Sequence, residues 1–204
     1  MAQFMRAKIS RRSWLLAGLA VPLFSARSTA PALNVLSDGD TLHVAAPQFH
    51  FLAGKPLAHL MDGATVVFLS QLTLRDDHGI VFRRQPERLT ISYDVWEEKF
   101  KVVMSVDRRS VSGLSLAAAE TWCLNNLAIS TLGMEPNRLF WLNLDLRVAT
   151  ERELSALMGD SGISIRNWVE FFSRKPGADQ PYHLEAGPFR LADLPRTLAH
   201  GTRG

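Results

Sequence analysis

The chain has 204 residues, of which 47% are hydrophobic and 21% charged, a composition typical of folded proteins and not of disordered ones. It holds 23 basic and 20 acidic side chains, but five of the basic ones and no acidic one fall in residues 1–30. The other 174 residues therefore carry 18 basic and 20 acidic side chains, a net charge of −2. This balance argues against nucleic acid or an anionic membrane as a partner.

Residues 1–30 have the three-part layout of an export signal: a basic start, an apolar run and small residues at the end. The apolar run, Trp14 to Phe24, has eleven residues. As a helix it would reach about 16 Å, too short to span a hydrocarbon core of about 30 Å. We therefore predict cleavage after Ala30 and no stable membrane span once the signal has been removed.

Two adjacent arginines, Arg11 and Arg12, lie in the stretch Ser-Arg-Arg-Ser-Trp-Leu just before the apolar run. This stretch resembles the twin-arginine export motif, and the alternative is an ordinary secretory signal whose basic region contains two neighbouring arginines. We favour the twin-arginine interpretation, which predicts a periplasmic or other extracytoplasmic location.

Residues 31–204 read as a single β-rich domain, with 196–204 as a disordered tail. Alternation of apolar and polar residues, the mark of half-buried strands, is clearest in 140–148 and in the pair 88–94 and 99–106, which 95–98 would join as a hairpin. We expect further strands at 41–46, 48–52, 64–74, 79–84 and 189–191.

Helical patterns interrupt the strands. Ser115 is a candidate N-cap for a helix that places Cys123 on its apolar face. Thr150 and Glu153 have the spacing of a capping box, and a further apolar stripe runs from 165 to 172. Strands outnumber helices and do not alternate with them, so we predict a mainly β, α+β fold. Its form would be an antiparallel β-sandwich or curled sheet covered by two or three short helices.

Three stretches resemble an uncharacterised family of exported bacterial proteins, a domain of unknown function. They are residues 60–68 (LMDGATVVF), 89–102 (LTISYDVWEEKFKV) and 189–195 (FRLADLP). The resemblance implies an envelope protein of unknown specific role, and it transfers no catalytic residue because none of the stretches contains a chemical signature.

No catalytic or metal-binding set stands out in the sequence, and we predict no catalytic residue, no metal and no cofactor. Asp76, Asp77 and His78 are better explained as a turn than as a metal site, because aspartate side chains bond their own backbone in turns. Cys123 lies on the apolar face of its helix, so we expect a buried and inert thiol. As the only cysteine it leaves no internal disulfide.

Two places are candidate binding sites. Trp141 shares one face of its predicted strand with Asn143, Asp145 and Arg147, and a tryptophan on a polar face marks a helix contact, an interface or a binding platform. Trp96, Glu97 and Glu98 lie at the predicted hairpin tip, where they could hold a cation or a sugar, although a solvated turn explains them better.

We therefore expect an exported, non-enzymatic binding or assembly module whose partner is a protein or another component of the cell envelope. Two alternatives stay open. One is a hydrolase whose site is assembled only in the fold, for example from His43, His50 or Asp62. The other is a carrier of an apolar ligand between sheet and helices.

Overall fold

The structure is a computed structural model that describes residues 32–159, 162–163, 165–173 and 182–196. The predicted export signal, with Arg11, Arg12 and the cleavage position after Ala30, lies outside the described residues, as do residues 197–204 of the predicted tail. Within the described part of the chain, no helix has the length and apolar character needed to cross a lipid bilayer.

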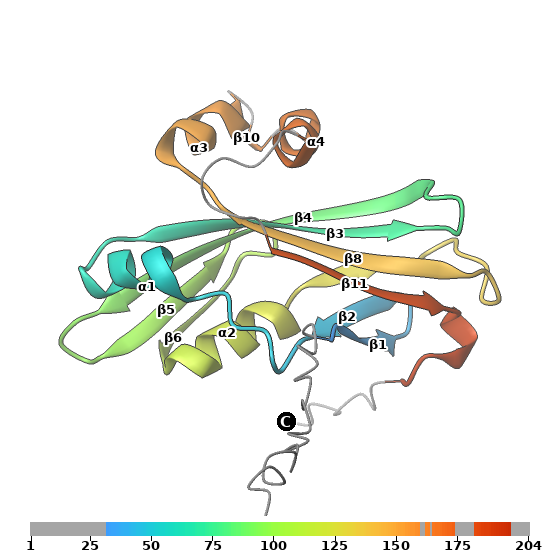
Figure 1. Cartoon of the computed structure of the whole chain (residues 1–204), viewed down its shortest axis with the longest axis horizontal. Helices are drawn as coiled ribbons and strands as arrows, with labels where there is room; N and C mark the ends of the chain where they lie inside the picture. Colours follow the sequence, from blue (N-terminus) through green and yellow to red (C-terminus); the bar gives the residue numbers. More distant parts are fainter. Residues whose placement is uncertain (1–31, 160–161, 164, 174–181, 197–204) are drawn as a thin grey trace, which may run out of the picture.

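A six-stranded antiparallel sheet forms the centre of the molecule, with the strand order β11-β8-β3-β4-β5-β6 (Figure 1). Its strands are β3 (Val66–Arg75), β4 (Val81–Asp94), β5 (Lys99–Met104), β6 (Arg109–Leu114), β8 (Phe140–Val148) and β11 (Tyr182–Phe189). The central strand β3 is buried along nearly its whole length, and β8 alternates between buried and half-buried residues.

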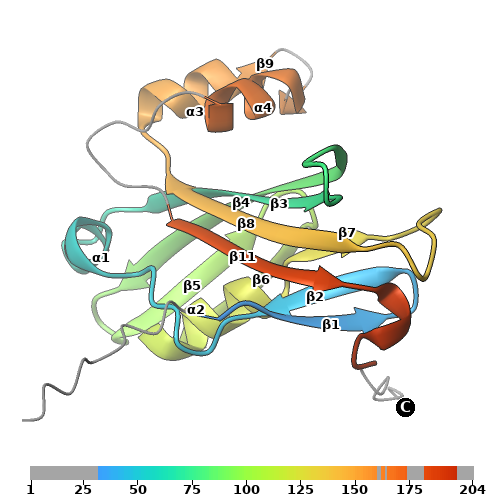
Figure 2. The ribbon, with the colours of Figure 1, turned by 45° about the vertical axis from the view of Figure 1, so that its right-hand side comes forward.

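A second layer covers one face of this sheet, which we call the inner face (Figures 1 and 2). It consists of a three-stranded antiparallel sheet in the order β1-β2-β7 and two helices. These elements are β1 (Asn34–Asp38), β2 (Thr41–Ala45), β7 (Ala128–Ser130), α1 (Gly54–Met61) and α2 (Leu116–Asn125).

The main hydrophobic core lies between these two layers. Phe68 and Leu72 of the large sheet pack in one cluster with Leu42 of β2 and with Ala119 and Cys123 of α2. Full burial of each large apolar side chain stabilises the fold by about 2 kcal/mol. The structure confirms the predicted α+β class and the antiparallel sandwich covered by short helices.

A smaller core lies on the opposite, outer face of the large sheet. Helices α3 (Glu151–Leu157) and α4 (Ile165–Ser173) form this cover, together with the short strands β9 (Met158–Gly159) and β10 (Gly162–Ile163). Val67 and Leu69 of β3 pack there against Leu157, Trp168 and Phe171. The cover is partial, because β3, β8 and β11 extend well beyond the two helices (Figure 1).

Both predicted helix starts have the expected hydrogen bonds. The Ser115 hydroxyl accepts the Ala118 N–H at the start of α2. At the start of α3, the Thr150 hydroxyl accepts the Glu153 N–H and the Glu153 carboxylate accepts the Thr150 N–H, the reciprocal pair of a capping box.

The prediction of a strand at 48–52 is wrong. This segment is a loop between β2 and α1, although Phe49, Phe51 and Leu52 are buried in the main core. The Leu52 N–H is held by the buried carboxylate of Glu120 at 2.8 Å and not by a neighbouring strand. The apolar residues of this segment therefore reflect burial of the loop in the core and not strand pairing.

The strand predicted at 189–191 is misplaced, and the strands predicted at 79–84 and 88–94 form one continuous strand. Residues 191–193 form a short 3-10 helix, and the last strand is β11, which ends at Phe189. Every second position of β11 faces the open part of the outer face and is polar or glycine, which weakens the apolar signal. Residues 81–84 of one predicted strand and 88–94 of the next belong to the single long strand β4, whose middle is too polar to be recognised as a strand.

Candidate functional site

The open end of the outer face carries a group of polar and aromatic side chains arranged in rows across β3, β8 and β11. Strand register pairs Arg75 with Trp141, then Thr73 with Asn143 and Glu185, then Gln71 with Asp145 and His183. We call one set of six the outer-face cluster: Arg75, Trp141, Asn143, Asp145, His183 and Glu185.

Hydrogen bonds and ion pairs connect the cluster. Arg75 Nη2 lies 2.6 Å from Glu185 Oε2, and its Nε donates to Asn143 Oδ1 at 3.4 Å. His183 Nδ1 lies 2.7 Å from Asp145 Oδ1, and its Nε2 lies 4.0 Å from Glu185 Oε2. These contacts join side chains from three strands into one polar network whose members all remain partly exposed to solvent.

Trp141 lies between the flanking strands of this network. The Arg75 guanidinium carbon is 5.9 Å from the centroid of the indole ring on the β3 side. On the β11 side the ring covers the backbone of Gly187, where an added Cβ would come within 2.8 Å of Trp141 Cδ1. The glycine at this position therefore leaves room for the indole beside β11, where Trp141 is half-buried.

The predicted polar face of β8 is divided by the helical cover. Asn143 and Asp145 lie in the open part, but Arg147 is only 8% exposed beneath α3 and α4. Its guanidinium carbon stacks 3.7 Å from the centroid of the Phe171 ring and its Nη2 pairs with Glu153 at 2.7 Å. Through these two contacts Arg147 links the helical cover to the sheet, and it is not part of the open surface.

The second predicted binding site, at the tip of the β4–β5 hairpin, is a solvent-exposed turn. The Asp94 carboxylate accepts the backbone N–H groups of Trp96 and Glu97, and Glu98 adopts a left-handed conformation with φ 54°. The Trp96 side chain is 96% exposed and makes no ring contact within the described part of the chain. The turn interpretation is therefore confirmed, and this site lacks the supporting network that surrounds Trp141.

The aspartate-rich stretch at 76–78 is also a turn, as predicted. Asp76 Oδ1 accepts the N–H groups of His78 and Ile80, and Oδ2 accepts Arg138 Nη2 at 2.8 Å. Burial opposes ionisation of Asp76, but these hydrogen bonds and the Arg138 charge outweigh it and hold the pKa below its ordinary value. Among the described residues, no three potential metal ligands converge on one point.

The three residues named for a hydrolase lie on separate elements. His43 is on β2, Asp62 follows α1, and His50 lies in the loop between them. Of the three, only His50 has a side-chain partner among the described residues: its Nδ1 lies 2.8 Å from Oε2 of buried Glu120 on α2. Since Glu120 also accepts the Leu52 N–H, this pair anchors the loop to the helix.

Cys123 is fully buried, as its position on the apolar face of α2 predicted. Burial, together with the nearby charge of Glu120, raises the pKa of its thiol to about 12. A thiol with this pKa is almost never ionised at neutral pH, so Cys123 is a core residue and not a nucleophile.

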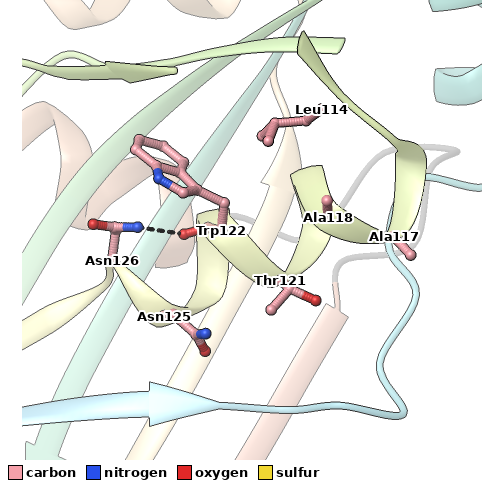
Figure 3. Close-up of a pocket in the computed structure, with 7 residues that line it drawn as sticks. All are labelled: Leu114, Ala117, Ala118, Thr121, Trp122, Asn125 and Asn126. Carbon is pink, nitrogen blue, oxygen red and sulfur yellow. Dashed lines mark hydrogen bonds between the residues drawn. The ribbon is translucent and has the colours of Figure 1, made fainter. Parts of the chain in front are cut away.

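A groove of about 540 Å³ lies along the outer side of α2 (Figure 3). Leu114, Ala117, Ala118 and Trp122 form its apolar part, and Thr121, Asn125 and Asn126 add polar groups. It is open to solvent along the helix. A carrier of apolar ligands needs an enclosed cavity between sheet and helices, so this groove does not support that alternative.

Sequence reasoning found part of the outer-face cluster and missed the rest. It found Trp141, Asn143 and Asp145 because they share one strand face. It missed Arg75, His183 and Glu185, which lie more than 35 residues away along the chain and reach the same place through strand pairing. Alternating polar positions in β11 were the one local signal that could have revealed the last two.

Comparison with known proteins identified no relative: no family model, no curated protein and no solved structure matches this chain.

Proposed function

We propose that this chain is an exported protein of the bacterial cell envelope that binds another protein through the outer-face cluster. Export is supported by the basic start, the short apolar run and the paired residues Arg11 and Arg12. Binding is supported by one observation above all. A rigid sheet presents an indole, a guanidinium, an imidazole and two carboxylates side by side to solvent.

The form and composition of this surface favour a protein partner. Sites for small ligands are concave, whereas the cluster lies on the open end of a sheet (Figure 1). Tryptophan and arginine are the residues most enriched at the energetic centres of protein interfaces. Because Arg75, Glu185, His183 and Asp145 already hold one another in place, they lose little conformational freedom when a partner binds.

A non-enzymatic role fits the surroundings of the two histidines that pair with carboxylates. His183 lies against Asp145 and His50 against Glu120. Within the described ranges, no serine, threonine or cysteine side chain is hydrogen-bonded to either imidazole. A nucleophile activated by a histidine requires that contact, so we place binding ahead of hydrolysis.

An envelope saccharide is the second candidate ligand. An aromatic ring bordered by amide and carboxylate groups also suits a sugar, and Asn143 and Glu185 lie in the row beside Trp141. The two ligand classes are separable by experiment, because treatment with protease destroys a protein ligand and leaves a saccharide intact.

The test is a binding experiment with two matched tryptophan variants. The exported protein would be immobilised and exposed to envelope extract from the organism that produces it. We expect Trp141→Ala to weaken retention of the partner about tenfold or more, because it removes the aromatic centre of the surface. Trp96→Ala, which removes an even more exposed tryptophan, should retain the partner at the wild-type level.

Thermal unfolding decides how the result is interpreted. We expect the Tm of Trp141→Ala to lie within about 3 °C of wild type, because the ring is partly solvent-exposed. Loss of binding at an unchanged Tm supports the proposal, and loss of a protease-resistant ligand supports the saccharide. Equal retention by both variants would overturn the proposal, and a large fall in the Tm of Trp141→Ala would show that Trp141 is a structural residue.

A further inference from the structure

Strand β6 forms one edge of the large sheet. It pairs with β5 on one side, and among the described residues no backbone–backbone hydrogen bond reaches its other side. Every residue of β6 is exposed or half-buried. In an antiparallel sheet the backbone groups of alternate residues point away from the neighbouring strand, so this edge offers unpaired N–H and C=O groups to solvent.

The groove along α2 adjoins the end of this edge. Leu114, the last residue of β6, lines the groove together with Ala118 and Trp122 of the helix (Figure 3). Val111 of β6 and Trp122 of α2 pack against the same inner core, which places the helix beneath the inner face of the edge strand. An unpaired strand edge and a partly apolar groove are therefore neighbours.

An extended peptide could use both features at once. A strand added to β6 would bond to the unpaired backbone groups, and alternate side chains would point toward the two faces of the sheet. The side chains on the inner face would lie on the same side as α2. A medium-sized apolar side chain there would reach the groove near Leu114 and Trp122.

The charge at the start of this edge favours an acidic residue opposite it. Arg109 is the only charged residue of β6, and Asp107 and Arg108, which precede it, offset each other. On the neighbouring strand, Lys99 of β5 lies directly opposite Asp94 of β4, so the basic charge of this edge is local to Arg109. Arg109 is exposed and donates to Asn126 Oδ1 at the end of α2, so its guanidinium lies between the strand and the helix.

We propose that the β6 edge and the α2 groove form a second interaction surface, which accepts an extended acidic segment of another protein as an added strand. In the antiparallel direction, which pairs slightly more strongly, the acidic residue lies opposite Arg109 and an apolar residue lies near Leu114. A second copy of this chain fits less well, because β6 contains no acidic residue that could lie opposite Arg109. This surface is distinct from the outer-face cluster.

The test uses a labelled peptide and the full chain. The probe is acetyl-Thr-Leu-Thr-Val-Thr-Glu-Glu-amide, and its control replaces both glutamates with lysines. Fluorescence anisotropy should show the acidic peptide binding about tenfold or more tightly than the lysine peptide. Methylation of the backbone nitrogens of one alternate set of residues should abolish binding, whereas methylation of the other set should leave it unchanged, because only one set faces β6.

Four variants then locate the site. Thr121→Arg, which fills the groove with a charge, should weaken binding about tenfold, whereas Thr65→Arg, at an exposed position outside the groove, should not change it. Arg109→Glu should lose the acidic peptide and bind the lysine peptide instead, a gain that misfolding cannot produce. Trp141→Ala should bind the peptide normally, which separates this surface from the proposed function.

Three results would overturn the proposal. The first is equal binding of the acidic and lysine peptides, which would show that charge does not select the occupant. The second is equal sensitivity to both methylation patterns, which would exclude an added strand. The third is a concentration-dependent dimer, seen by light scattering and abolished by Thr121→Arg, which would make a second copy the occupant.

Discussion

Trp141 illustrates how the role of a single residue depends on its cross-strand neighbours. The sequence of its own strand indicates only that this tryptophan lies on the polar face of β8. The contacts that define its environment come from Arg75 on one side and Gly187 on the other. The glycine has φ +140° and leaves room for the ring, so the position of the indole depends on the absence of a side chain on another strand.

Cys123 allows a direct test at the scale of one residue. Because burial raises the pKa of its thiol to about 12, we expect the folded protein to resist iodoacetamide at pH 8, since the thiolate is the species that reacts. The unfolded chain in urea should react fully under the same conditions. Mass spectrometry of the alkylated protein measures both, and rapid labelling of the folded protein would contradict the buried position.

The turn that joins β3 to β4 provides a prediction at the scale of an element. The pKa of Asp76 is lower in the folded protein than in the unfolded chain, so the folded state favours the ionised carboxylate. Its contribution to stability is therefore complete above the unfolded pKa of about 4 and is lost as pH falls through the folded pKa. We expect Asp76→Asn to lower the free energy of unfolding at pH 7 and to make its decline toward pH 3 shallower.

Urea unfolding at several pH values measures this effect, and the neighbouring residue supplies the control. Asp77 is about half exposed, and among the described residues its carboxylate pairs with the His78 side chain alone, at 3.6 Å. We expect Asp77→Asn to follow the wild-type curve, because an exposed ion pair of this kind contributes little. Parallel curves for wild type and Asp76→Asn would show that the Asp76 hydrogen bonds do not govern acid stability.

Elements with strong local signals were predicted well from the sequence. The capping box at Thr150 and Glu153, the N-cap at Ser115 and the β4–β5 hairpin all depend on residues within a few positions of one another. The failures were segments whose partners are distant. The loop at 48–52 is held by Glu120, about seventy residues further along the chain, and no local pattern reveals such an anchor.

At the scale of the whole molecule, the helical cover on the outer face is a separate packing unit. Its buried core, which includes Leu157, Trp168 and Phe171, is distinct from the main core. Arg147 links the cover to the sheet through Phe171 and Glu153. We expect Arg147→Met to destabilise docking of the cover by about 2–3 kcal/mol, because the Glu153 carboxylate and the Phe171 carbonyl lose their charged partner.

Native-state hydrogen exchange can detect this change. Amides of α3 and α4 should lose protection in Arg147→Met, whereas amides of the buried strand β3 should keep most of theirs. Arg190→Met, at an exposed position outside the cover, is the matched control and should leave both regions unchanged. Equal loss of protection in the cover and in the sheet would show that the protein unfolds as one cooperative unit.

The sequence by itself determined the mainly β class, the strongest strands and helix starts, and the burial of Cys123, because these follow from local periodicity and capping. It also supplies the prediction of export, which rests on residues 1–30 alone. The tertiary structure determined which side chains that are distant in the sequence lie next to one another. Strand pairing brought His183 and Glu185 to Arg75, and helix packing removed Arg147 from the open surface. Such contacts join residues far apart in the chain, and no local pattern records them.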